Sequence, residues 1–296
     1  MNGLALGLAA AAGLCNAVGD VLERSSAQRE DSDPRESIRL VARLARRPRW
    51  WLGVIASILG LGLHIAALSR GPLAVVQPML VVELPLAVLG SAVFLGRHLV
   101  WRDWVAVAAM AAGLAAFVRF LAPSGGERLQ VSGASWAVAT AVVVGLALVL
   151  AVAGWRTGQD LRAALLATAG GVGYGLTGVF FSTAAALLDV GGIGAALGAW
   201  QTWASIITGV TSFYLLQNAL AAGRLVVVEP GITLANPIVA TTWALVIFKE
   251  FASGGAALLG VGFGVASIVV GVVVLGGSPA LRDGERPAAQ TARTDR

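Results

Sequence analysis

Residues that could bind a solute lie in two strongly apolar segments, which read VVQPMLVVELP (75–85) and VVEPGITLANP (227–237). Each segment holds two prolines seven residues apart, and these are Pro78 and Pro85, and Pro230 and Pro237. A proline inside a helix frees the backbone carbonyl four residues earlier, which is costly in lipid unless protein or water meets it. We therefore expect both segments to border a cavity, although a packing kink would produce the same pattern.

Carboxylates and amides in these segments are the side chains that could contact a ligand. Glu83 lies in the middle of an apolar run, where a charged residue costs at least ~2.5 kcal/mol, so we expect it to face a cavity and to be a substrate-binding or coupling group. The alternative for Glu83 is a protonated acid bonded to a neighbouring helix. The further candidate binding residues are Gln77, Glu229, Asn236, His64, Gln217, Asn218 and Tyr174.

A structural role is the alternative for several of these residues. Glu229 could be a solvated residue at the membrane interface, and Asn236 could join two helices by a hydrogen bond. His64 could be a packed core histidine. Gln217 and Asn218 directly follow the position that corresponds to His64 in a repeat described below, so both halves carry polar groups there.

No pattern of catalytic residues occurs in the sequence, which lacks a Ser–His–Asp arrangement, a Cys/His metal cluster and a Walker loop. Gly173, Gly175 and Gly178 spell GxGxxG, but no strand precedes them and they lie in an apolar run, which argues against nucleotide binding. Cys15 is the single cysteine, so no intramolecular disulfide can form. We expect neither enzymatic activity nor a cofactor.

The composition indicates an integral membrane protein. Of the 296 residues, 57% are hydrophobic and only 12% are charged, whereas a soluble domain carries about 25% charged residues. A membrane-spanning helix needs ~20 mostly apolar residues. By this measure an all-α protein with about nine transmembrane helices is expected, at 3–22, 51–69, 72–95, 104–121, 133–154, 163–188, 200–221, 225–248 and 254–276.

The distribution of basic residues predicts the orientation of these helices. If the basic loop at 23–50 is cytoplasmic and the helices alternate, 17 of the 21 Lys and Arg residues lie on the cytoplasmic side. The other four are Arg70, Arg119, Arg128 and Lys249. Because cytoplasmic loops carry an excess of Lys and Arg, we expect the N-terminus outside and the C-terminus inside the cell membrane, with the charges on lipid headgroups and not on nucleic acid.

The two proline segments belong to a longer internal repeat. Pro78 and Pro230, and likewise Pro85 and Pro237, are 152 residues apart, and Trp51 and Trp203 have the same offset. The first four helices (1–121) therefore correspond to the last four (163–276), with 133–154 as a connector and 278–296 as a disordered cytoplasmic tail. An odd number of spans separates the two halves, which predicts an inverted repeat of the kind common in transporters.

These features resemble the drug/metabolite transporter (EamA-like) superfamily. The resemblance rests on the 4+1+4 plan, on GPLAVVQP at residues 71–78, and on the sequence FKE at Phe248, Lys249 and Glu250. The chain is most similar to the NIPA-like membrane proteins, several of which are regarded as magnesium transporters. No substrate motif of that family transfers to this sequence residue by residue.

The sequence leaves three functions open. The first is a proton-coupled secondary transporter that exports a small metabolite or drug by alternating access. The second is a NIPA-like Mg²⁺ transporter, in which Glu83 and Glu229 would supply the oxygen ligands that this ion prefers. The third is a membrane scaffold without transport. Tryptophans, including Trp51, Trp200, Trp203 and Trp243, could line a site or anchor the helices at the interface. The protein is expected to be a monomer or a homodimer.

Overall fold

The computed structural model describes residues 3–27, 47–95, 99–121, 126–223, 225–250 and 257–276, and within these ranges it is helical without any strand. The helices are α1 (Gly3–Ala27), α3 (Pro48–Arg70), α4 (Leu73–Met79), α5 (Glu83–Leu95), α6 (Trp101–Leu121), α7 (Gly133–Trp155), α8 (Gln159–Gly198), α9 (Trp200–Ala222), α10 (Leu225–Val246) and α11 (Ala257–Gly276). The all-α fold class is therefore confirmed. Most of the basic loop and all of the expected tail at 278–296 lie outside the described residues.

Five stretches of the described helices are long and apolar enough to cross a membrane, and these are Pro48–Arg70, Leu73–Gly90, Trp101–Leu121, Gly133–Trp155 and Gln159–Gly198. Two shorter apolar stretches, Gly3–Gly19 and Leu259–Leu275, occur in α1 and α11. The segment at 200–221 is helical as expected, although its 23-residue helix α9 does not reach the same apolarity. Gln217 and Asn218 near its end, together with several Ser and Thr residues, lower its hydropathy.

The exposed surface of the bundle is apolar. In α7 the described side chains are mostly exposed, and Val138, Val142 and Val149 are each 66% accessible. A soluble monomer rarely exposes such a continuous apolar surface. Lipid chains would cover this surface in a bilayer, which agrees with the membrane class that the composition indicates.

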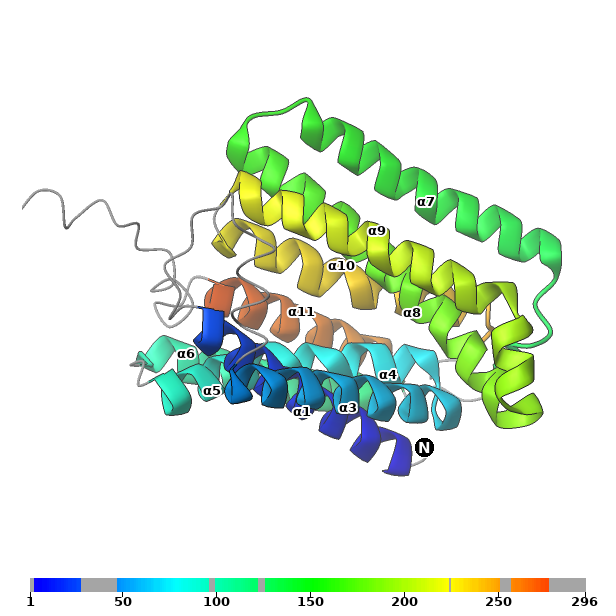
Figure 1. The fold of residues 1–296 in the computed structure, drawn as a ribbon, viewed down its shortest axis with the longest axis horizontal. Coiled ribbons are helices and arrows are strands. Elements are labelled where there is room, and N and C mark those ends of the chain that lie inside the picture. Colours follow the sequence, from blue (N-terminus) through cyan, green and yellow to red (C-terminus); the bar gives the residue numbers. More distant parts are fainter. Residues whose placement is uncertain are drawn as a thin grey trace, which may run out of the picture.

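Figure 1 shows the helices running roughly along one long axis, with α1 and α3–α6 on one side of the bundle and α7–α10 on the other. Within the first group α1 packs on α3 and α5, and within the second α8 packs on α9 and α10. Contacts between the groups run from α10 to α4 and from α3 to α8, and α11 packs on both α6 and α10. Small residues allow these approaches, since a β-carbon on Gly113 of α6 would lie 2.8 Å from the carbonyl oxygen of Gly264 in α11.

The apolar segment expected at 72–95 is a helix in three parts. α4 ends at Met79, a 3₁₀ turn covers Leu80–Val82, and α5 starts at Glu83. The change follows Pro78, which has no N–H to donate and crowds the preceding turn. α10 contains Pro230 and Pro237 but is described as one continuous helix.

α8 is longer than the expected segment at 163–188. It extends to Gly198, and the backbone inside it is not helical at Gly192, where φ is +69°. This conformation is open to glycine and strained for other residues. Gly192 therefore permits a change of direction before the chain enters α9.

Candidate functional site

A cavity of about 230 Å³ lies where α4 and α10 come together, and Pro78 and Pro237 both line it. α10 supplies further lining residues, and α6 and α11 supply the opposite walls, including Phe117, Leu121 and Ile268. Thr241 and Thr242 of α10 are its polar lining residues, and the side-chain oxygen of Thr241 is buried without a hydrogen-bond partner among the described residues. The cavity is thus mainly apolar, with unpaired hydrogen-bonding capacity on one wall.

Two amide residues lie against α8 close to this crossing, Gln77 through its side chain and Asn236 through its backbone. Gln77 of α4 is 2% exposed, and its Nε2 would overlap a β-carbon placed on Gly178. The backbone oxygen of Asn236 in α10 would lie 2.7 Å from a β-carbon on Gly175. Residues three apart in a helix are neighbours on its surface, so Gln77 and Asn236 lie over adjacent positions of α8.

Both amides retain hydrogen-bonding capacity. Gln77 Oε1 and Asn236 Oδ1 are buried and have no hydrogen-bond partner among the described residues. Buried polar groups are nearly always paired, so such atoms at a helix crossing deserve a functional explanation. The geometry fits a polar solute or a water chain bound between α4, α8 and α10.

Glu83 lies on a different side of α4 and α5. It is half-buried at the start of α5, and Asn16 Nδ2 of α1 donates to its Oε2 across 3.4 Å. The interface around it is close, because a β-carbon on Gly13 of α1 would lie 3.1 Å from Val82 and 3.9 Å from the backbone nitrogen of Glu83. The structure thus places this carboxylate between α1 and α5 and not in the lining of the apolar cavity.

The remaining candidates are dispersed. His64 on α3 and Tyr174 on α8 are half-buried, and His64 Nδ1 has no partner among the described residues. On α9, Gln217 is exposed, while Asn218 donates to the carbonyl of Tyr214 in its own helix (2.8 Å). Pro85 is buried and Pro230 half-buried, and neither lines the cavity at Pro78. The side chain of Glu229 lies outside the described part of the structure.

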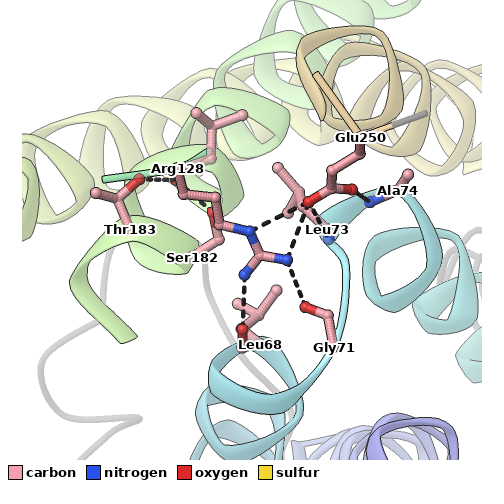
Figure 2. A network of polar contacts seen from close by, with 9 residues as sticks. Leu68, Gly71, Leu73, Ala74, Arg128, Ser182, Thr183 and Glu250 are labelled. Carbon is pink, nitrogen blue, oxygen red and sulfur yellow. Dashed lines mark hydrogen bonds and ion pairs between the residues drawn. The ribbon is translucent and has the colours of Figure 1, made fainter. Parts of the chain in front are cut away.

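An ion pair that the sequence did not single out joins the two helix groups (Figure 2). Arg128 precedes α7 and Glu250 follows α10, and the guanidinium Nη2 lies 3.0 Å from Glu250 Oε1. The Glu250 carboxylate also accepts the backbone N–H groups of Leu73 (3.0 Å) and Ala74 (2.9 Å), while Arg128 donates to the carbonyl of Leu68 (2.8 Å). The pair thereby satisfies backbone groups on both sides of the corner between α3 and α4, which have no partners within their own helices.

An aromatic cluster lies at the same end of the second helix group. Trp136 of α7 is its centre, with ring centroids 5.3 Å from Trp243, 5.3 Å from Trp200, 5.7 Å from Phe180 and 5.8 Å from Phe248. Trp243 is buried, whereas Trp51 and Trp203 are half or more exposed. The tryptophans therefore divide between internal packing and surface positions.

Sequence reasoning missed the ion pair because its members are 122 residues apart and both lie outside the expected spans. The sequence held only an indirect signal for this pair. Both residues are charged and lie next to apolar spans, where a charge can cap the end of a helix as well as face water. No group of three His, Cys, Asp or Glu side chains that could hold a metal ion occurs among the described residues.

Comparisons with known proteins identify a relative without a described activity. No family model matches the chain, and no solved structure matches it. An uncharacterized protein from Corynebacterium glutamicum is 30% identical over 254 residues, which cover 84% of this chain and 86% of that protein. At this identity and coverage the chain belongs to the same family as this uncharacterized corynebacterial protein.

Proposed function

We propose that the protein is a secondary transporter of the drug/metabolite transporter type, which exports a small organic solute across the cell membrane by alternating access and is coupled to protons. The proposed topology has nine spans, in which α1–α6 and α8–α11 form inverted repeats and α7 connects them. The N-terminus is outside and the C-terminus is cytoplasmic.

The meeting of α4 and α10 is the observation that carries this proposal. Under the 152-residue offset, Pro78 corresponds to Pro230 and Pro85 to Pro237. If the two halves were parallel, corresponding prolines would lie at the same depth in the membrane. Instead, the cavity is lined by Pro78 and Pro237, which do not correspond to each other. The end of α10 also meets the start of α4 through Glu250 and Leu73. Both features support halves of opposite orientation, as in inverted-repeat transporters.

The chemistry near the crossing supports an organic solute. The cavity walls are mainly apolar, and the nearby amides of Gln77 and Asn236 each have an acceptor oxygen that no described residue pairs. Apolar walls with a few placed polar groups are typical of small-molecule sites. No specific observation favours the Mg²⁺ alternative, which continues to rest on Glu83 and Glu229 in the sequence alone.

A flux assay tests the proposal. The purified protein is first screened for small organic compounds and divalent cations that raise its melting temperature, since a ligand that binds the folded state stabilises it. Compounds that do so are then followed in proteoliposomes with an imposed pH gradient. The proposal predicts saturable, gradient-dependent movement of an organic compound. Movement of Mg²⁺ alone, or no movement beyond that in empty liposomes, would contradict it.

A further inference from the structure

The chain turns back sharply after α10, and this turn brings Glu250 to the first helix group. Lys249 has φ of +54°, a left-handed conformation uncommon outside glycine. The N–H of Glu250 then donates to the carbonyl of Ala244 (3.0 Å), which closes the end of α10. The side chain of Glu250, none of it exposed, reaches Leu73 and Ala74 at the start of α4.

Arg128 completes the connection from a third segment, the loop before α7. Its Nε and Nη2 donate to Glu250 Oε1 over 3.1 and 3.0 Å, and it also donates to the carbonyls of Leu68 and Gly71 at the end of α3. The adjacent backbone N–H of Glu127 donates to the carbonyl of Phe248 (2.8 Å). Figure 2 shows the guanidinium between the α3–α4 corner and the end of α10.

Water can reach one side of this ion pair. The Arg128 side chain is 14% exposed and lies in the wall of a polar hollow of about 470 Å³, together with Ser69, Glu127 and Gln130. On the other side, α4 runs from Leu73 at the ion pair to Pro78 at the apolar cavity. Five residues of helix span about 7.5 Å, so along α4 the ion pair lies between the polar hollow and the candidate solute site.

We infer that Arg128 and Glu250 form a gate, which closes this end of the bundle and separates when the solute site opens toward it. The inference rests on the proposed transport function. In alternating access the end of α10 must move away from the start of α4, and these contacts join the two. A buried ion pair is costly to break when its groups remain dry. Here the hollow would supply water to the separated carboxylate, the guanidinium and the freed backbone groups.

Site-directed labelling tests the gate. Cys15 is replaced by serine and Ser182 by cysteine, which yields a single reporter thiol. Ser182 is fully buried on α8, one turn deeper than Ala186 in the wall of the hollow. The rate of reaction with a membrane-impermeant maleimide is measured in vesicles of both orientations, for the parent protein and for Glu250→Gln. Glu127→Gln serves as the matched control, because Glu127 is a neighbouring, exposed carboxylate.

If the gate exists, Glu250→Gln should increase the labelling rate on the order of tenfold, because hydrogen bonds to a charged group are lost. The increase should occur from one face only, which is the outer face in the proposed topology. Glu127→Gln should leave the rate unchanged. Arg128→Lys keeps the positive charge but loses the forked geometry, so it should give an intermediate increase and carries the test if Glu250→Gln does not fold.

Three results would overturn the gate. The first is that Glu250→Gln folds and has a lowered melting temperature but is labelled at the parent rate. The second is that its labelling increases equally from both faces. The third is that Glu127→Gln increases the labelling rate as much as Glu250→Gln does. Because labelling requires no solute flux, a one-sided increase in a protein that moves no solute would refute the transport function and leave the gate standing as a conformational device.

Discussion

At the residue scale, the buried polar side chains fall into two sets, those with hydrogen-bond partners and those without partners among the described residues. Arg128 and Glu250 are joined to each other and to backbone groups of the α3–α4 corner. By contrast, Gln77 and Asn236 each keep a buried acceptor without a partner among the described residues. A fully satisfied network favours a single conformation, whereas unpaired groups are available to a ligand. We therefore propose that Arg128 and Glu250 control the conformation and that Gln77 and Asn236 contact the solute.

Substituting Gly178 by alanine tests the role of Gln77. The new methyl group would overlap the Gln77 amide, and because that amide is the end of a flexible side chain, it should rotate away without unfolding the helix. Loss of one hydrogen bond to the solute corresponds to ~0.5–1.5 kcal/mol, or up to about tenfold weaker binding. Ligand-induced stabilisation and flux should both fall.

Gly145→Ala is the control for this substitution, because a β-carbon there meets nothing within 4 Å. In this control, flux should be unchanged and the melting temperature equal or slightly higher. If Gly178→Ala retains full binding and flux, Gln77 does not contact the solute.

Glu83→Gln tests proton coupling. The amide oxygen can still accept the bond from Asn16, so folding and expression should stay near those of the natural protein, while the titratable group is lost. If Glu83 couples transport, solute movement driven by a pH gradient should disappear and its dependence on pH should flatten. An unchanged rate and pH profile would make Glu83 a structural partner of Asn16.

The candidate site was only partly readable from the sequence. Gln77 and Asn236 could be predicted because a proline follows each one directly. The location of Glu83 against α1 could not, since the sequence gives depth in the membrane but not the direction in which a side chain faces. Arg128 and Glu250 could not be predicted either, because pairing across 122 residues depends on the packed fold.

At the scale of elements, the two proline helices respond differently to the same pattern. α4 gives way to a 3₁₀ turn after Pro78, while α10 continues through Pro230 and Pro237. One cause is support from neighbours, since α10 packs closely along α8. The prolines could be recognised in the sequence, but which helix breaks depends on tertiary contacts. The extension of α8 beyond 188 likewise depends on the backbone conformation of Gly192.

Pro78→Ala tests whether the break between α4 and α5 is needed for movement. Alanine restores a backbone N–H and favours a regular helix by up to ~3 kcal/mol, partly offset by the lost ring contacts in the cavity. The melting temperature should hold or rise while flux falls several-fold. Pro48→Ala is the control, because Pro48 is exposed in the first turn of α3, where proline is well tolerated. Equal flux in both variants would show that the break is only a packing feature.

At the scale of the molecule, composition and the length of the apolar runs were sufficient to predict an all-α membrane protein, because only 12% of the residues are charged and the runs have the length of membrane-spanning helices. The pairing of α4 with α10, and of α6 with α11, required the structure. These contacts provide the setting in which two halves could open alternately toward either face.

The reciprocal accessibility of the solute site tests alternating access most directly. With Cys15 replaced by serine and Gln77 by cysteine, an impermeant maleimide is applied to right-side-out and inside-out vesicles, with and without Glu250→Gln. The account predicts labelling from both faces, and it predicts that Glu250→Gln raises the rate from the outer face while lowering the rate from the cytoplasmic face. Labelling from one face only, or a change at one face without the opposite change at the other, would contradict alternating access.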